Sequence, residues 1–211
     1  MTRPTGQLYS LSMNPPHDTR QRIIESARDL IYSRSYAEVG VAAICDSAGV
    51  KKGSFYHFFP SKRELTLAVI DEFLVEFKQR IFVEAFDPAL SPMNRIRKLA
   101  QLAYRFQKEV AEETGQTLGC PFGNIAGEMS TQDEVMRLKV ETIFAQMEAL
   151  FRDTLTEAVT LGEIDAIDIS ATASAMVAYT EGLMLMAKTR NDPEIIRNLM
   201  PAIVDIRILP T

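Results

Sequence analysis

The chain has 211 residues, of which 46% are hydrophobic, and it carries a formal net charge of −5. This apolar content is enough to build a buried core, which excludes a disordered chain. The charge is uneven, because residues 1–65 carry nine Lys and Arg against six Asp and Glu, giving +3, whereas residues 66–211 carry −8. This asymmetry favours an N-terminal part that faces nucleic acid on an acidic body.

No apolar run approaches the roughly 18 residues of a membrane span, and the opening segment lacks the continuous apolar stretch of a secretory signal. We therefore expect a cytoplasmic protein without membrane contact. Its two cysteines lie far apart in the sequence and are expected to be reduced. Residues 1–16, which end in a Pro-Pro pair, are expected to form a disordered tail.

The chain is expected to be all-α, because helical periodicity is frequent and sustained alternation of polar and apolar residues is missing from the sequence. Asp18 and Gln21 have the spacing of a capping box that opens the first helix. A short helix is predicted at residues 41–48, where Gly49 ends it by taking a positive φ.

A third short helix is predicted at residues 52–59, and Pro60 stops it. Ser61 and Glu64 form a second capping box, which opens a longer helix that is expected to reach about residue 84. Further helices are predicted at residues 91–113, 121–130, 132–161, 167–190 and 193–207.

The predicted helix 167–190 is apolar nearly all round, with small residues such as Ala178 and Gly182 among larger ones. A helix without a polar face is expected to be buried on every side. We interpret this helix as a subunit interface, with a central core helix inside one chain as the alternative.

Two short helices joined by Ala48-Gly49-Val50 are typical of a helix-turn-helix. Three phenylalanines of the second helix have i, i+3 and i+4 spacing and are expected to anchor it, namely Phe55, Phe58 and Phe59. The outward face then carries Gly53, Ser54 and His57, with Gly53 allowing close approach to a DNA backbone.

Positive charge gathers at the two ends of this second helix. Lys51 and Lys52 lie at its N-terminus, where backbone N–H groups and the helix dipole favour a phosphate. Ser61 and Lys62 begin the next helix and offer a second phosphate contact. A solvated basic face on a purely structural helix pair is the alternative.

The stretch VGVAAICDSAGVKKGSFYHFFPSKREL resembles the DNA-binding domain of the TetR family of one-component repressors. The resemblance implies a three-helix DNA-binding domain at residues 17–65 and a larger helical ligand-binding and dimerisation domain at residues 66–211. It also implies a homodimer formed by the last two helices, which would bind a palindromic double-stranded DNA operator. The family's DNA-contacting positions correspond to Lys52, Ser54, Tyr56, His57 and Lys62.

This sequence departs from the family at Lys51, where a capping Ser or Thr is frequent. A cap worth about 1 kcal/mol is lost there, and a charge that attracts phosphate is gained. Cys45 lies where the family commonly has Ala, and we interpret it as a small packing residue.

Cys120 directly precedes Pro121, a residue suited to the first position of a helix. If Cys120 is the N-cap, the helix dipole is expected to lower the pKa of its thiol and raise the thiolate fraction. An inert buried cysteine fits these residues equally well.

The stretches LGCPFGNIAGEMS and EGLMLMAK resemble a branch of the TetR family that includes the N-ethylmaleimide-responsive repressor. This resemblance implies that Cys120 senses electrophiles and oxidants. Lys188 is a candidate to stabilise the thiolate, or else a solvated cation at a helix end. The other pocket candidates are Asn124, Glu128, Tyr179 and Glu181, for which a solvated polar face is the alternative.

The sequence thus predicts a DNA-binding repressor that a reactive electrophile or oxidant releases from its operator through Cys120. The alternative effector is a noncovalent apolar or small-acid ligand in a cavity lined by residues such as Phe106, Phe144, Phe151, Met184 and Met186. A cysteine-dependent enzyme is remote, since the two histidines, His17 and His57, both lie in the N-terminal part. No cofactor or metal is expected, because the sequence lacks a Gly-rich phosphate loop and metal-ligand spacing.

Overall fold

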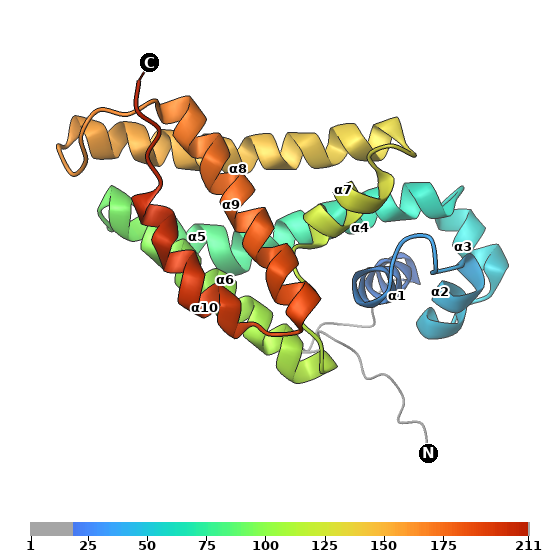
Figure 1. The fold of residues 1–211 in the computed structure, drawn as a ribbon. Coiled ribbons are helices and arrows are strands. Elements are labelled where there is room, and N and C mark those ends of the chain that lie inside the picture. The colour runs from blue at the N-terminus through green and yellow to red at the C-terminus, as the bar shows by residue number, and fades with distance from the viewer. Residues whose placement is uncertain (1–18, 211) are drawn as a thin grey trace. The chain divides into compact units, whose positions relative to one another are not determined.

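A computed structural model of the chain describes residues 19–210, and every regular element within them is a helix (Figure 1). The expected tail at residues 1–16, His17 and the Asp18 cap lie outside the described residues. The chain divides into two compact units, Met1–Phe73 and Leu74–Thr211. The functional boundary predicted between residues 65 and 66 falls inside a helix and remains a prediction.

The first unit contains α1 (Thr19–Ser33), α2 (Val41–Ala48), α3 (Lys52–Phe58) and most of α4 (Lys62–Phe77). Gly49 ends α2 in the left-handed conformation, at φ 64°. The N–H groups of Gly49 and Val50 donate to the carbonyls of Asp46 and Cys45, at 3.3 and 3.0 Å. These two bonds form a Schellman motif, so the predicted glycine stop is confirmed and sets the turn into α3.

The helix that follows begins as predicted and ends differently. The Ser61 hydroxyl accepts from the Glu64 backbone N–H at 3.2 Å, which is the predicted cap. The expectation of one helix to residue 84 is wrong, because α4 changes after Phe77 into a π-helix, η1 (Lys78–Phe82), and then into the short α5 (Val83–Ala85). Such wider turns leave no signature in a pattern read at 3.6 residues per turn.

The second unit is built from α6 (Pro92–Thr114), α7 (Pro121–Met129), α8 (Glu134–Thr160), α9 (Ile169–Arg190), α10 (Glu194–Leu199) and the 3-10 helix η2 (Met200–Asp205). The five predicted ranges match within about two residues, except that the last is part α-helix and part 3-10 helix. α8 packs against α6 and α9, and α10 with η2 covers α6 (Figure 1). The core between them includes Ile96, Phe151, Leu155, Ala173 and Met176.

Helix α9 is buried along one side and exposed along the other. Ala173, Met176 and Ala187 are fully enclosed, and a stripe on the opposite side is open to solvent in the single chain. That stripe consists of Ser174, Ala178, Gly182, Leu185 and Met186. A central core helix within one chain is therefore wrong for α9, and the subunit interface remains a prediction.

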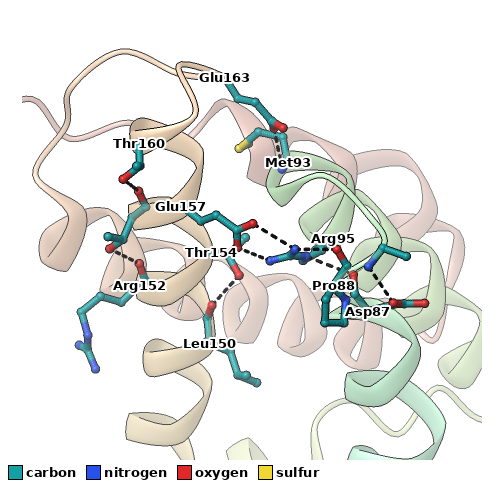
Figure 2. A network of polar contacts seen from close by, with 12 residues as sticks. Asp87, Pro88, Met93, Arg95, Leu150, Arg152, Thr154, Glu157, Thr160 and Glu163 are labelled. Carbon is teal, nitrogen blue, oxygen red and sulfur yellow. Dashed lines mark hydrogen bonds and ion pairs between the residues drawn. The ribbon is translucent and has the colours of Figure 1, made fainter.

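A half-buried arginine, Arg95, fixes the start of α6 to the end of α8 (Figure 2). The Arg95 guanidinium donates twice to the Glu157 carboxylate, at 2.5 and 3.2 Å, and also donates to the backbone carbonyls of Asp87 and Pro88. A bidentate pair of this kind fixes geometry as well as adding energy. The segment after α5 is thereby held against the two helices that supply Leu99 and Phe151 to the cavity described below.

Candidate functional site

The outer face of α3 is polar and open. Phe55 and Phe59 are buried as predicted, at 0% and 4% exposure, and Phe58 is half-buried. The opposite face exposes Lys51, Lys52, Gly53, Tyr56 and His57, with Ser54 half-buried. A Cβ built on Gly53 would meet no atom within 4 Å, so this face is unobstructed within its own unit. Aromatic anchoring therefore turns the predicted DNA-contacting side chains outward.

The two predicted phosphate contacts differ in their surroundings. Lys51 is the N-cap of α3 and makes no side-chain capping bond, which confirms the expected loss of a cap. The Lys62 ammonium donates to the Tyr36 carbonyl at 2.8 Å and lies 4.0 Å from the centre of the Tyr36 ring. Lys62 thus also holds the α1–α2 connection to α4, a role that its position in the sequence did not reveal.

The second unit encloses a cavity of about 60 Å³. Its wall is mainly aromatic and aliphatic, and includes Phe77, Phe82, Phe86, Phe106 and Phe151. Of the apolar candidates named from the sequence, Phe106, Phe151 and Met184 line this cavity, whereas Phe144 and Met186 do not. The polar groups on the wall are Gln107, Cys120, Thr180 and Glu181.

Cys120 is the N-cap of α7, as the sequence predicts. Its sulfur accepts from the Gly123 backbone N–H at 3.4 Å, and Pro121 occupies the first turn. The side chain is 7% exposed. The Gln107 amide holds Gly119, the residue before Cys120, by two hydrogen bonds. It donates to the Gly119 carbonyl at 2.8 Å and accepts from the Gly119 N–H at 3.1 Å. The thiol is thus placed on the cavity wall by two independent anchors.

Glu181 of α9 lies close to this thiol, and each of the two groups shifts the pKa of the other. The carboxylate also lies against the backbone of Gly123, since a Cβ built there would be 2.2 Å from the Glu181 Oε2 atom. Glycine at this position therefore leaves the space that the carboxylate occupies. From the sequence, Glu181 was only a secondary candidate; its signal was an acidic residue on an apolar helix.

The expected lowering of the Cys120 pKa is wrong. Burial and the Glu181 carboxylate raise the pKa of the Cys120 thiol well above its usual value, although the Gly123 N–H acts in the opposite direction. Burial likewise raises the pKa of Glu181 to about 7. The backbone N–H groups of Gly123 and Phe122 do not outweigh the loss of water around a sulfur with a carboxylate neighbour. At neutral pH the resting residue is a thiol.

The remaining predicted effector residues lie outside the cavity wall. The Lys188 ammonium donates to the Asn124 Oδ1 atom at 2.8 Å, and Asn124 donates in turn to the Leu118 carbonyl at 2.9 Å. Burial lowers the pKa of Lys188, and Glu128 partly counters that shift. The Tyr179 hydroxyl donates to the Leu199 carbonyl at 2.7 Å. These groups fix α7 and α10 to α9, and the charged neighbour of the thiol is Glu181.

Two family profiles match the sequence. The profile described as bacterial regulatory proteins, tetR family, matches residues 23–69, and the one described as tetracyclin repressor-like, C-terminal domain, matches residues 92–203. The chain belongs to the TetR family. It is therefore a DNA-binding transcriptional regulator with a helix-turn-helix domain followed by a helical C-terminal domain, and it is not an enzyme.

Similar TetR-family proteins cover most of the chain. An uncharacterized HTH-type regulator of Lactococcus lactis is 27% identical over 86% of this chain and 89% of its own. The crystal structure of a TetR regulatory protein from Rhodobacter sphaeroides has a TM-score of 0.79 at 27% identity, covering 90% of this chain and 99% of that one.

A third similar protein is the Escherichia coli transcriptional repressor NemR. It is 30% identical over 71 residues, which are 34% of this chain and 36% of NemR. The crystal structure of its reduced form has a TM-score of 0.75 at 23% identity, covering 92% of this chain and all of that chain, and this shows a shared fold.

Within residues 19–210, none of the helices combines the length and apolar character that a membrane span requires. In the same part of the chain, no three His, Cys, Asp or Glu side chains gather in a way that would hold a metal ion.

Glu181 should make the stability of the TetR-family fold depend on pH. Because the pKa of this carboxyl rises from 4.5 to about 7 on folding, its contribution is full below pH 4.5 and is lost as the pH rises through 7. We expect urea unfolding to show a free energy of unfolding that falls by about 2 kcal/mol over this range, after allowance for solvent screening. Glu181→Gln should remove this fall, and Asp153→Asn on the exposed face of α8 should retain it.

Proposed function

We propose that this regulator is a repressor that binds a palindromic operator as a homodimer and leaves it when a small electrophile or oxidant reacts with Cys120. The observation that carries the proposal is a cysteine placed by a helix cap on the wall of a cavity in the C-terminal domain. NemR, a relative over part of the chain, is named a repressor. Because the proposed operator is DNA inside the cell, we place the protein in the cytoplasm.

The DNA-binding part of the proposal assigns distinct tasks to the residues of α3. Tyr56, His57 and Ser54, with Gly53 allowing close approach, would face base edges and the adjoining backbone. Lys51 and Lys52 at the start of α3, together with Lys62, would contact phosphates. This division separates residues that set sequence preference from residues that set affinity for any DNA.

Lys52→Ala should lower the salt dependence of operator binding by about one unit in the slope of log K against log salt, because one phosphate contact is lost. Lys62→Ala should lower the slope equally. Since Lys62 also bonds to Tyr36, that variant should unfold at a lower temperature as well. Lys108→Ala, on an exposed part of α6, is the control. A slope that stays unchanged in Lys52→Ala would remove this residue from the phosphate contacts.

The homodimer would use the exposed stripe of α9. Leu185 is 64% exposed and Met186 is 39% exposed in the single chain, beside the small residues Ala178 and Gly182. Small residues let two helices approach closely, and exposed large apolar residues next to them favour burial against a partner. A dimer would place two α3 helices on half-sites about 34 Å apart, or a multiple of that distance.

Sedimentation at micromolar concentration should give a dimer for the wild type and a monomer for Leu185→Glu, because the substitution buries an unpaired charge at the interface. Val83→Glu is the matched control, since Val83 is 71% exposed and lies on α5. A wild type that sediments as a monomer would contradict the proposed assembly.

A noncovalent ligand is the second candidate for the effector, and the raised pKa of the Cys120 thiol favours it. The apolar wall suits an uncharged ligand. It does not suit the small acid considered from the sequence, because the carboxylate of such a ligand would share an apolar cavity with Glu181.

The route from the cavity to the DNA would be α4. This helix begins at Lys62 and ends at Phe77, whose ring lines the cavity. A ligand or adduct that moves Phe77 therefore acts on the same helix that carries a proposed phosphate contact.

The first test is a mobility-shift assay with the DNA upstream of the protein's own gene, performed with and without N-ethylmaleimide. A shift that the reagent reverses supports the proposal. Binding that is strengthened by the reagent would overturn release as the mode of regulation.

A further inference from the structure

The charges around the cavity are of one sign. Among the described residues that line it, Cys120 and Glu181 are the titratable ones. The other polar side chains are neutral and engaged, since Gln107 bonds to the Gly119 backbone and the Thr180 hydroxyl donates to the Met176 carbonyl at 2.9 Å. An ionised Glu181 therefore meets no cationic side chain on this wall.

The nearby cations outside the wall are used elsewhere. Lys188, on the same helix as Glu181, donates to Asn124 of α7 and lies in the field of Glu128. Arg80 of η1 pairs with Glu76 and with Glu109 of α6, and its guanidinium carbon lies 4.9 Å from the centre of the Phe106 ring. The thiol and the carboxyl are thus left to exchange a proton with each other.

The position of the carboxyl depends on Gly123. A methyl group there would occupy the place of the Glu181 Oε2 atom and would be 3.5 Å from the Cys120 Cβ atom. Cys120 at the cap of α7, Gly123 of α7 and the Glu181 carboxylate of α9 therefore form one cluster at the cavity wall.

We infer that Glu181 accepts the proton that the Cys120 thiol gives up when an electrophile is attached, and that the same carboxylate restricts the site to small uncharged electrophiles. This inference rests on the proposed function and names the chemical class of the effector.

The reaction balances without an oxidant. With a maleimide, the Cys120 sulfur forms a bond to one carbon of the C=C double bond, and the π electrons move onto the neighbouring carbonyl as an enolate. The S–H proton passes to a Glu181 oxygen and then to the other carbon of the former double bond. The products are a thioether and a restored carboxylate.

The exclusion of anions follows from the same geometry. A ligand carboxylate would add a second negative charge beside Glu181 in an apolar space, which raises the free energy of both ionised groups. An uncharged electrophile meets no such penalty and is attracted by the apolar wall.

The test measures the rate of Cys120 alkylation by N-ethylmaleimide with mass spectrometry, in the Cys45→Ser background. Glu181→Gln should react at least about tenfold more slowly at pH 7.5, since a positioned base contributes this much or more. If Glu181 only suppresses the thiolate, Glu181→Gln should react faster than its parent. That result, or an unchanged rate, would overturn the inference.

The pH profile separates a proton acceptor from a structural role. The rate for the parent protein should rise with pH and level off above about 7, where Glu181 is ionised. The rate for Glu181→Gln should keep rising towards the pKa of the thiol. Identical profiles in the two proteins would contradict proton transfer to Glu181.

Gly123→Ala is the second variant, because it displaces the carboxylate while leaving Glu181 in the chain. The displaced atom is the end of a flexible side chain, so the fold should be retained, as far-UV circular dichroism can check. Alkylation should slow in this variant as it does in Glu181→Gln.

Lys188→Gln, the matched control on the same helix as Glu181, should react within about twofold of the parent. A larger effect of Lys188→Gln than of Glu181→Gln would assign the proton-handling role to Lys188.

The charge preference is tested by comparing N-ethylmaleimide with 3-maleimidopropionate. The parent should react with the uncharged reagent at least about tenfold faster, and Glu181→Gln should reduce this ratio. Equal rates in the parent would overturn the exclusion of anions. DNA release is measured in a separate assay. If N-ethylmaleimide still releases Cys120→Ser from DNA, the proposed function is wrong, whereas these alkylation rates are unaffected.

Discussion

N-ethylmaleimide should weaken operator binding by the wild-type protein at least about a hundredfold, whereas Cys120→Ser should stay bound. A hundredfold change corresponds to about 2.7 kcal/mol of coupling, which is within the usual range between two sites. An adduct on Cys120 would enter a cavity of about 60 Å³ and press on wall side chains such as Phe77 and Phe106. Overpacking of this kind typically costs 1–3 kcal/mol.

The matched control for this prediction is Cys45→Ser. Cys45 is buried in α2 at 3% exposure, and burial together with Asp46 raises the pKa of its thiol. That variant should keep the full response to the reagent. Operator titrations by fluorescence anisotropy, before and after alkylation, measure both proteins. If wild type and Cys120→Ser lose operator binding equally, the proposal of a covalent effector at Cys120 is contradicted and a noncovalent ligand becomes the favoured effector.

Phe55→Ala should abolish operator binding by loosening the helix that carries the DNA contacts. The Phe55 ring is fully buried and contacts Phe59 at 6.2 Å between ring centres. Removing a buried phenylalanine typically costs 3–5 kcal/mol. The first unit is small, so a loss of this size is a large part of its stability.

Tyr56→Ala distinguishes a lost anchor from a lost contact. Tyr56 is the neighbouring residue and is 55% exposed, with its ring 5.1 Å from that of Phe55. This variant should retain its thermal unfolding midpoint within a few degrees and still lose operator affinity. Phe55→Ala should lower the midpoint of the first unit in differential scanning calorimetry. A normal midpoint in Phe55→Ala would show that α3 does not depend on this ring.

The helices were predictable because their signals are local. Gly49, Ser61 and Pro121 each act on the turn in which they stand, so the ends of α2, α4 and α7 follow from neighbouring residues. The cap by Cys120 was predictable for the same reason. The π-helix was not, because a turn closed by i→i+5 bonds leaves no signature in a pattern that is read at 3.6 residues per turn.

The electrostatics of the site were not predictable, since they depend on a residue far along the chain. Helix α9 brings Glu181 against Gly123, and burial then reverses the sign of the shift expected for the Cys120 pKa. Likewise, Lys188 was considered as a partner for the thiol, but its ammonium bonds to Asn124. A sequence places charges on a helix face, and only the packing of α7 on α9 decides which of them meets the sulfur.

The π-helix also affects the direction in which the phenylalanines before and after it point around the helix axis. In an unbroken α-helix each residue turns the chain by about 100°, so residue 86 would point about 180° away from residue 77. A turn closed by i→i+5 bonds takes up part of that rotation, and Phe77, Phe82 and Phe86 all reach one cavity. A relative of equal length whose residues 78–82 wound as an α-helix would lose this adjustment of the rotation. It would turn Phe86 out of the wall and keep the surface of α3 intact, so this short segment can alter ligand selection while leaving the operator unchanged.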